Sequence, residues 1–515
     1  MIDSFRKKFI KYVLVSFLFF IALAVWAIAS PVGSAPDEDF HQTMIYCASG
    51  KATACLENGV RYGHCFTMRP TVAGACKNYS DLELPIATTI NSNTALPVYY
   101  ETMQLFVSNT LGETTLNIRL TNALLAVLLG ALSVLLTFRE FRVAAFLSLV
   151  ICSVPAGFFF MSSISPSSWA IISVACLVGP LYSLVSQIGA KEFSCPRGRL
   201  AIQVIRTLFV CLLVAIGFGS RYETFIWIPV VVVFVTLANI GQLETLRSSR
   251  KILITVVFVI GFTLAAMVFV FVERSPIGFQ ALYELIATNP FSWWVLEKSF
   301  NTLFGMMALT GIPGAELGTH DAPITPIASF FISVAVGGAI FASISKATFR
   351  HAVLFVLLLV TVLFITLMLW SVQDWDYYQP RYFLPVFYFI LLFALLSQSA
   401  EHFIQESRYW FLILISVTIV HALALLSTLL RFTYGLKFQE SRFPLGKEAI
   451  DVDPSRLFAA PIPDWWLTDI SLLTPFSIWI IGSVSFTVAV LLAWTAMTQG
   501  VILRESNEPG SVSMK

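Results

Sequence analysis

Residues 10–29 read IKYVLVSFLFFIALAVWAIA, and this run decides the fold class. A helix needs about 20 apolar residues to cross the hydrocarbon core of a bilayer, and Lys11 carries the only charge here. Of the 515 residues, 57% are hydrophobic and 12% are charged, whereas soluble proteins carry roughly twice that charged share. The sequence therefore predicts an all-α polytopic membrane protein. Its formal net charge of +2 gives no indication of a nucleic-acid partner.

Further apolar runs predict a helical bundle of about twelve transmembrane helices in one domain, 1–515. The expected spans are 10–29, 117–137, 143–161, 168–187, 201–219, 224–240, 252–272, 326–345, 351–371, 383–398, 409–430 and 473–497. Only residues 220–223 separate the fifth span from the sixth. The segment 201–240 is therefore either a tight helical hairpin or one bent helix, and a bent helix would reverse every later orientation.

Lys and Arg residues set the expected orientation, because cytoplasmic loops are enriched in them. Arg6, Lys7, Lys8 and Lys11 place the N-terminus in the cytoplasm. Every second loop is then basic, through Arg139 and Arg142; Lys191, Arg197 and Arg199; Arg247, Arg250 and Lys251; Lys346 and Arg350; Arg408; and Arg504. This alternation favours the hairpin and predicts a multi-pass membrane protein with both termini cytoplasmic. A cleaved signal peptide ending near Ala29 is the alternative for the first span.

Three long loops are then extracytoplasmic, at 30–116, 273–325 and 431–472, and long loops often carry function. The first of them contains Cys47, Cys55, Cys65 and Cys76. In an oxidising compartment these cysteines predict two disulfides, with three possible pairings. Zinc binding is the alternative because His64 adjoins Cys65, but no tight C-x-x-C pair is present. We therefore expect a disulfide-stapled loop without a metal site.

Residues 34–41 read SAPDEDFH and follow the first span directly. Ser34 and Asp37 have the spacing of a capping box, which predicts a short amphipathic helix along the membrane surface. Residues 37–39, all acidic, would lie in its first turn. Because a helix N-terminus favours ionised carboxylates, Asp37 is a candidate to accept a proton or a hydrogen bond. The alternative is a solvated acidic helix start that only caps.

Two arginines are expected at the same outer face. Arg381 lies at the mouth of a span among tyrosines, and its guanidinium is suited to grip a phosphate; the alternative is an arginine that snorkels beside an aromatic belt. Arg221 lies in a hairpin beside Glu223, where the pair either binds a phosphate or neutralises itself. Tyr99 and Tyr100 of the first loop either line a sugar site or pack the loop. Together these residues suit an enzyme with a lipid-linked phosphate donor and an acceptor that arrives from outside.

The motif Pro31-x-Gly33-x-x-Pro36-Asp37-Glu38-x-x-His41 resembles the opening motif of a bacterial membrane-protein family, domain of unknown function 2142. A basic N-terminal span followed by a large first outer loop that opens with an acidic pair also resembles the GT-C superfamily of membrane glycosyltransferases. Over roughly residues 1–430, three later stretches are similar to motifs of that bacterial family: Leu96–Tyr100, Ser163–Ser167 and Gln379–Tyr382. Departures from these motifs occur at Leu96, Ser165, Ser167 and Pro380, so the turn at 162–167 inherits no acidic residue.

The resemblance implies a GT-C-like bundle with an active site on the extracytoplasmic face, and together with the disulfide-bearing outer loop it implies location in a bacterial plasma membrane. It implies a polyprenyl-phosphate sugar donor and an envelope glycan or glycolipid acceptor, with a divalent metal in only some members. Asp37 would be the general base and Glu38 a second acidic group. Arg381 would hold the donor phosphate, and Arg221 is assigned to the phosphate from topology alone. The remaining substrate-binding candidates are His41, Tyr99, Tyr100, Gln379 and Tyr382.

Two other functional classes stay open at this stage. The first is a transporter or flippase of lipid-linked envelope intermediates. It would need ionisable residues deep within spans, and the Lys and Arg residues cluster at the span ends instead. The second is a noncatalytic envelope assembly protein whose stapled loop binds partners.

Overall fold

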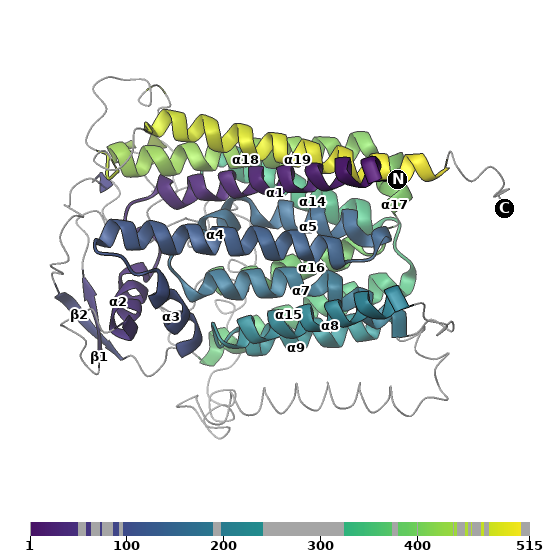
Figure 1. Ribbon diagram of the computed structural model, residues 1–515, viewed down its shortest axis with the longest axis horizontal. Helices are drawn as coiled ribbons and strands as arrows, with labels where there is room; N and C mark the ends of the chain where they lie inside the picture. Colours follow the sequence, from purple (N-terminus) through teal and green to yellow (C-terminus); the bar gives the residue numbers. More distant parts are fainter. Residues whose placement is uncertain are drawn as a thin grey trace.

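The computed structural model describes residues 2–49, 58–62, 73–74, 86–91, 96–188, 197–239, 324–372, 380–398, 400–435, 437–439, 449–451, 455, 465–467 and 473–505. Long helices in these residues run side by side as one bundle (Figure 1). The helices are α1 (Ile2–Ala29), α2 (Glu38–Ser49), α3 (Pro97–Met103), α4 (Leu111–Leu136), α5 (Arg142–Cys152), α6 (Phe158–Met161), α7 (Pro166–Ile188), α8 (Arg197–Phe218), α9 (Thr224–Ala238), α14 (Pro326–Ile344), α15 (Phe349–Val372), α16 (Leu384–Leu395), α17 (Ala400–Gln405), α18 (Ser407–Tyr434) and α19 (Pro475–Glu505).

Most of the predicted spans are helices of the bundle. Among the described residues, nine helical segments are long and apolar enough to cross a membrane, and α9 and α16 are shorter apolar helices. This confirms a multi-pass membrane protein. The predicted span 252–272 lies outside the described residues, so the count of twelve stays a prediction. Separate helices α8 and α9 contact each other, which confirms the helical hairpin at 201–240.

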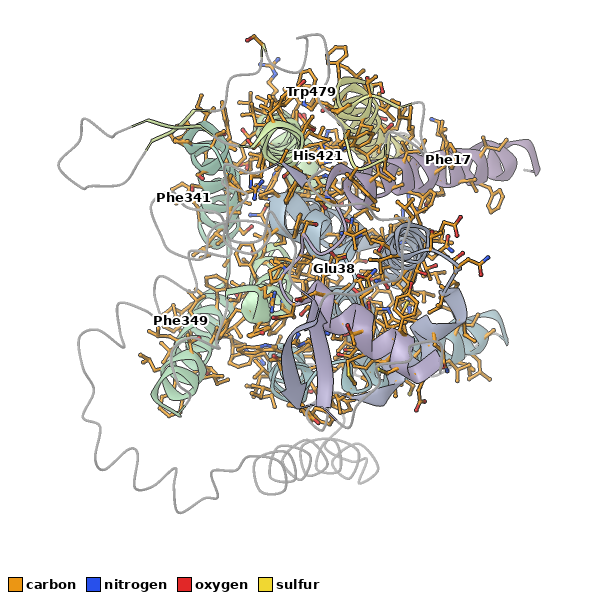
Figure 2. The ribbon with its side chains drawn as sticks, turned by 90° about the vertical axis from the view of Figure 1, so that its left-hand side faces the viewer. Phe17, Glu38, Phe341, Phe349, His421 and Trp479 are labelled. Atoms are coloured by element: carbon orange, nitrogen blue, oxygen red, sulfur yellow. The ribbon has the colours of Figure 1, made fainter. Side chains whose placement is uncertain are left out.

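The bundle has a buried centre and an apolar outer surface. In the apolar stretch of the segment Arg139–Met161, 89% of the residues are buried, whereas the value is 22% in Leu200–Phe218 of α8. Every residue of α16 from Leu384 to Leu395 is buried, which explains why that helix is apolar on all sides. Phe17, Phe341 and Phe349 point outward from the bundle, whereas Glu38 and His421 lie inside it (Figure 2). An apolar exterior of this kind is suited to a lipid bilayer.

One end of the bundle carries the short elements of the first outer loop. Helices α2 and α3 lie there with strands β1 (Asn58–Tyr62) and β2 (Ile86–Asn91), opposite the end where α1 begins (Figure 1). The strands pair antiparallel. A second small sheet pairs β3 (Lys437–Gln439) with β4 (Ala449–Asp451). The all-α prediction thus holds for the bundle but missed these strands. The sequence IATTIN of β2 is rich in β-branched residues, which favour strands.

Helix α4 begins before the predicted span at 117. Its first residue is Leu111, because the Thr110 hydroxyl accepts a hydrogen bond from the Glu113 amide and caps the helix. The start of α4 therefore lies before the apolar part of the helix and contacts α2, because Gln42 Nε2 donates to Thr115 Oγ1 and the Tyr46 hydroxyl donates to Thr114 Oγ1. Arg119, in the third turn of α4, contacts the end of α1 and the loop that follows it.

The structure describes one of the four cysteines in the disulfide prediction. Cys47 lies in α2, whereas Cys55, Cys65 and Cys76 lie outside the described residues. Both the two disulfides and their pairing therefore stay predictions.

Candidate functional site

The loop between α1 and α2 is folded differently from the predicted capping box. Helix α2 begins at Glu38 rather than next to Ser34, and the Ser34 hydroxyl accepts a hydrogen bond from Arg119 Nη2 at 3.2 Å. Gly33 and Asp37 both have positive φ angles, 79° and 59°. A positive φ is ordinary for glycine but uncommon for aspartate. The capping box was wrong because tertiary hydrogen bonds from α4 define the shape of this loop.

Arg119 and Glu38 form a buried clamp at the centre of this loop. Arg119 Nε lies 2.9 Å from Glu38 Oε1, and Arg119 Nη2 lies 2.6 Å from Glu38 Oε2. The same guanidinium donates to the carbonyl oxygens of Ala27, Ser30 and Pro31 at 2.6 to 2.9 Å. The Arg119 side chain is 1% exposed and the Glu38 side chain 0%. A buried ion pair of this kind persists only where hydrogen bonds satisfy both partners.

The Glu38 carboxylate also receives three backbone amides. Oε2 accepts from Gly33 and Ala35, and Oε1 accepts from Ile164 in the turn before α7. Both oxygens are thus engaged by the protein, and the group has no exposed surface. We therefore interpret Glu38 as the residue that holds the loop in place, which differs from the catalytic role expected for it.

Sequence reasoning missed Arg119, although a signal was present. Arg119 lies within the predicted span 117–137, where an arginine is costly unless it is paired inside the bundle. That cost predicts a buried acidic partner. The partner could not be identified without the fold, because 81 residues separate Arg119 from Glu38.

Asp37 points away from this clamp and pairs with Arg381. Arg381 lies in the short 3₁₀ helix η7 (Pro380–Phe383) that precedes α16. Its Nη2 contacts Asp37 Oδ2, so residues 344 positions apart in the chain meet in an ion pair. The Arg381 side chain is 2% exposed, whereas the Asp37 side chain is 30% exposed. The structure therefore brings together the two residues predicted at one outer face and leaves the carboxylate accessible.

The Arg381 guanidinium keeps unused donors. Its Nη2 donates to Asp37 and, at 3.1 Å, to the Tyr382 hydroxyl. Within the part of the chain that the structure describes, its buried Nε and Nη1 have no hydrogen-bond partner. Buried N–H groups without partners are costly, and a guanidinium with free N–H groups is suited to an anionic ligand.

Arg221 belongs to the same site as Arg381, because both guanidinium groups contact the ring of Tyr382. The guanidinium carbons of Arg221 and Arg381 lie 4.5 Å and 5.1 Å from the centroid of the Tyr382 ring. Arg221 also pairs with Glu223 at 3.1 Å and donates to Ser167 Oγ at 3.0 Å. Burial alone lowers the pKa of Arg221, but Glu223 and Tyr382 raise it, and the net shift is upward. Arg221 is thus a fixed positive charge, and the predicted Arg–Glu pair does form.

Tyr100 belongs to the site, whereas Tyr99 packs behind it. The Tyr100 hydroxyl lies 2.9 Å from Nδ1 of His41. Burial raises the pKa of the Tyr100 hydroxyl, while the positive charge of Arg221 lowers it and the negative charge of Asp37 raises it. The Tyr99 hydroxyl instead accepts from Asn122 Nδ2 at 3.2 Å, deep between helices. Tyr99 therefore supports the site without facing it.

Two expectations about the site are not tested by this geometry. Gln379, a predicted substrate-binding residue, lies outside the described residues. Among the residues with described positions, no group of three or more His, Cys, Asp and Glu side chains is arranged to hold a metal ion. The use of a divalent metal remains a prediction.

The fold and the site together define a multi-pass membrane protein with an ion-paired polar site at one end of its bundle. The family of predicted membrane proteins DUF2142 matches residues 19–390 of this chain, and the chain belongs to that family. The matched range includes both halves of the site, from Asp37 to Arg381. This confirms the family resemblance seen in the motif at 31–41. No curated protein matches the chain.

Proposed function

We propose that this protein is a GT-C-like membrane glycosyltransferase. It transfers a sugar from a polyprenyl-phosphate donor to a glycan or glycolipid acceptor of the cell envelope, on the extracytoplasmic face. The observation that carries the proposal is the meeting of an accessible carboxylate, Asp37, with a buried guanidinium that has unused donors, Arg381. A base and an anion site side by side at the end of a membrane bundle suit a lipid-phosphate donor.

The proposed reaction needs one base and one group that stabilises negative charge. The acceptor hydroxyl attacks the anomeric carbon of the donor sugar while its proton passes to Asp37. A bond forms between the acceptor oxygen and the anomeric carbon, and the bond from that carbon to the phosphate oxygen breaks. The polyprenyl phosphate leaves with the bonding electron pair, and Arg381 stabilises the negative charge that develops on it. Attack in one step inverts the anomeric configuration.

The other residues of the site have supporting roles in this proposal. Arg221 adds a second positive charge across the Tyr382 ring. Tyr100 and His41 present a hydrogen-bonded polar pair beside Asp37, where sugar hydroxyls would bind. The Arg119–Glu38 clamp fixes the backbone that carries Asp37, so only the Asp37 side chain has to adjust when the substrates arrive.

The role of Arg381 is tested by Arg381→Lys. Lysine keeps the charge but lacks the planar fork that binds phosphate through two parallel hydrogen bonds. We expect the KM for the donor to rise about tenfold, with a smaller effect on the KM for the acceptor. Initial-rate kinetics of sugar transfer in detergent measure both constants. The exposed Arg408, at the start of α18, supplies a matched control as Arg408→Lys; equal donor KM values in the two variants would remove Arg381 from donor binding.

A further inference from the structure

The ion pair between Asp37 and Arg381 has a consequence for the order in which substrates bind. We infer that Asp37 and the donor phosphate compete for Arg381, so that donor binding releases the Asp37 carboxylate for the acceptor hydroxyl. This inference rests on the proposed function and adds to it a regulation of the same site. Before the donor binds, Arg381 engages the base; donor binding removes this contact.

The geometry of the guanidinium makes the competition direct. An arginine offers two edges for a bidentate contact, one formed by Nε and Nη2 and the other by Nη1 and Nη2. Both edges include Nη2. In this structure Nη2 is engaged by Asp37 Oδ2 and by the Tyr382 hydroxyl. A phosphate that binds through either edge must therefore replace one of these two partners, and Nε and Nη1 are ready to complete the contact.

Asp37 is the partner that is easier to displace. Its side chain is 30% exposed, so a released carboxylate keeps access to water and to an acceptor. The Tyr382 ring is held by cation–π contacts, because the guanidinium carbons of Arg221 and Arg381 lie 4.5 Å and 5.1 Å from its centroid. The neighbouring backbone does not need to move, because Glu38 and the amides of Gly33 and Ala35 are fixed by the clamp.

The charges of the site favour an exchange rather than simple addition. Arg381 is balanced by Asp37, and Arg221 is balanced by Glu223. An added phosphate would place its negative charge beside the Asp37 carboxylate, and like charges in contact repel. Moving Asp37 away from Arg381 removes this repulsion. The inference therefore predicts that a neutral residue at position 37 improves phosphate binding even though it removes the base.

The test measures binding without transfer. The probe is farnesyl phosphate, a short polyprenyl phosphate, and its neutral counterpart is farnesol; both are titrated into the full-length purified protein in detergent. We expect wild type to bind farnesyl phosphate more tightly than farnesol. We expect Asp37→Asn to bind farnesyl phosphate about fivefold more tightly than wild type, because a partly exposed ion pair no longer competes. Farnesol should bind equally to both proteins.

Two further variants keep the test independent of folding defects. Asp37→Gly removes the side chain and suits the positive φ, so it should fold and bind at least as tightly as Asp37→Asn. Glu113→Gln removes one exposed negative charge from the first turn of α4 and should bind like wild type. One result would contradict the competition but leave the proposed donor site intact. In that result, both Asp37 variants bind farnesyl phosphate no more tightly than wild type, while wild type still prefers farnesyl phosphate to farnesol. No preference for the phosphate in any protein would overturn both proposals.

Discussion

Arg119→Met is expected to lower the free energy of unfolding by about 3–5 kcal/mol, because it leaves the Glu38 charge buried without its partner. The variant also leaves the carbonyl oxygens of Ala27, Ser30 and Pro31 without the hydrogen bonds they now accept. Each buried group that loses its hydrogen bond adds to the cost. Thermal unfolding of the purified protein in detergent measures this loss of stability. The readout is the fraction of the protein that stays monodisperse at each temperature.

Two controls distinguish the loss of the Arg119–Glu38 ion pair from a general effect of removing an arginine. Arg408→Met replaces an exposed arginine and should change stability by no more than about 0.5 kcal/mol. The double variant Arg119→Met with Glu38→Gln removes both charges, so it should be more stable than Arg119→Met alone. An Arg119→Met protein that unfolds at the same temperature as Arg408→Met would contradict the structural role of the clamp.

Asp37→Asn is expected to lower kcat for sugar transfer by about 10²–10⁴-fold, the usual contribution of a general base. The protein should stay folded, because the side chain is partly exposed and asparagine tolerates the left-handed backbone found at this position. Transfer of a labelled sugar under saturating donor and acceptor measures kcat.

The neighbouring Asp39 provides the matched control for this loss. Its Oδ1 accepts a hydrogen bond from the Phe40 amide at 2.9 Å, whereas Arg381 pairs with Asp37. Asp39→Asn should therefore transfer sugar at nearly the wild-type rate. If Asp37→Asn and Asp39→Asn have equal kcat values, Asp37 is not the base, and the proposed chemistry loses its central residue.

The sequence alone predicted that the residues of the site lie on one face of the membrane, but it did not predict which of them contact each other. Apolar periodicity and the alternation of basic loops placed Asp37, Arg221 and Arg381 at one face, and the structure brings all three to one end of the bundle. That inference needs only which side of a membrane each loop occupies. The contact between Asp37 and Arg381 depends on how helices pack, which periodicity does not specify.

The acidic residues show why local rules were insufficient. Capping rules treat Ser34 and Asp37 as a helix start, because they consider only the next few residues of the chain. In the structure the competing partner is Arg119 of α4, whose hydrogen bonds to Ser34 and Glu38 outweigh a local cap. The same tertiary contact changes the interpretation of Glu38 from catalysis to support. Aspartates and glutamates in one short motif can therefore have unrelated tasks.

Sugar transfer by the purified protein reveals which class of donor the enzyme uses. Purified wild-type protein in detergent is given an envelope glycolipid acceptor with either a panel of polyprenyl-phosphate sugars or the matching nucleotide sugars. The account predicts sugar transfer from a polyprenyl-phosphate sugar with release of one polyprenyl phosphate per sugar transferred, and no transfer from nucleotide sugars. Transfer from nucleotide sugars alone, or no transfer from any polyprenyl-phosphate donor, would contradict it.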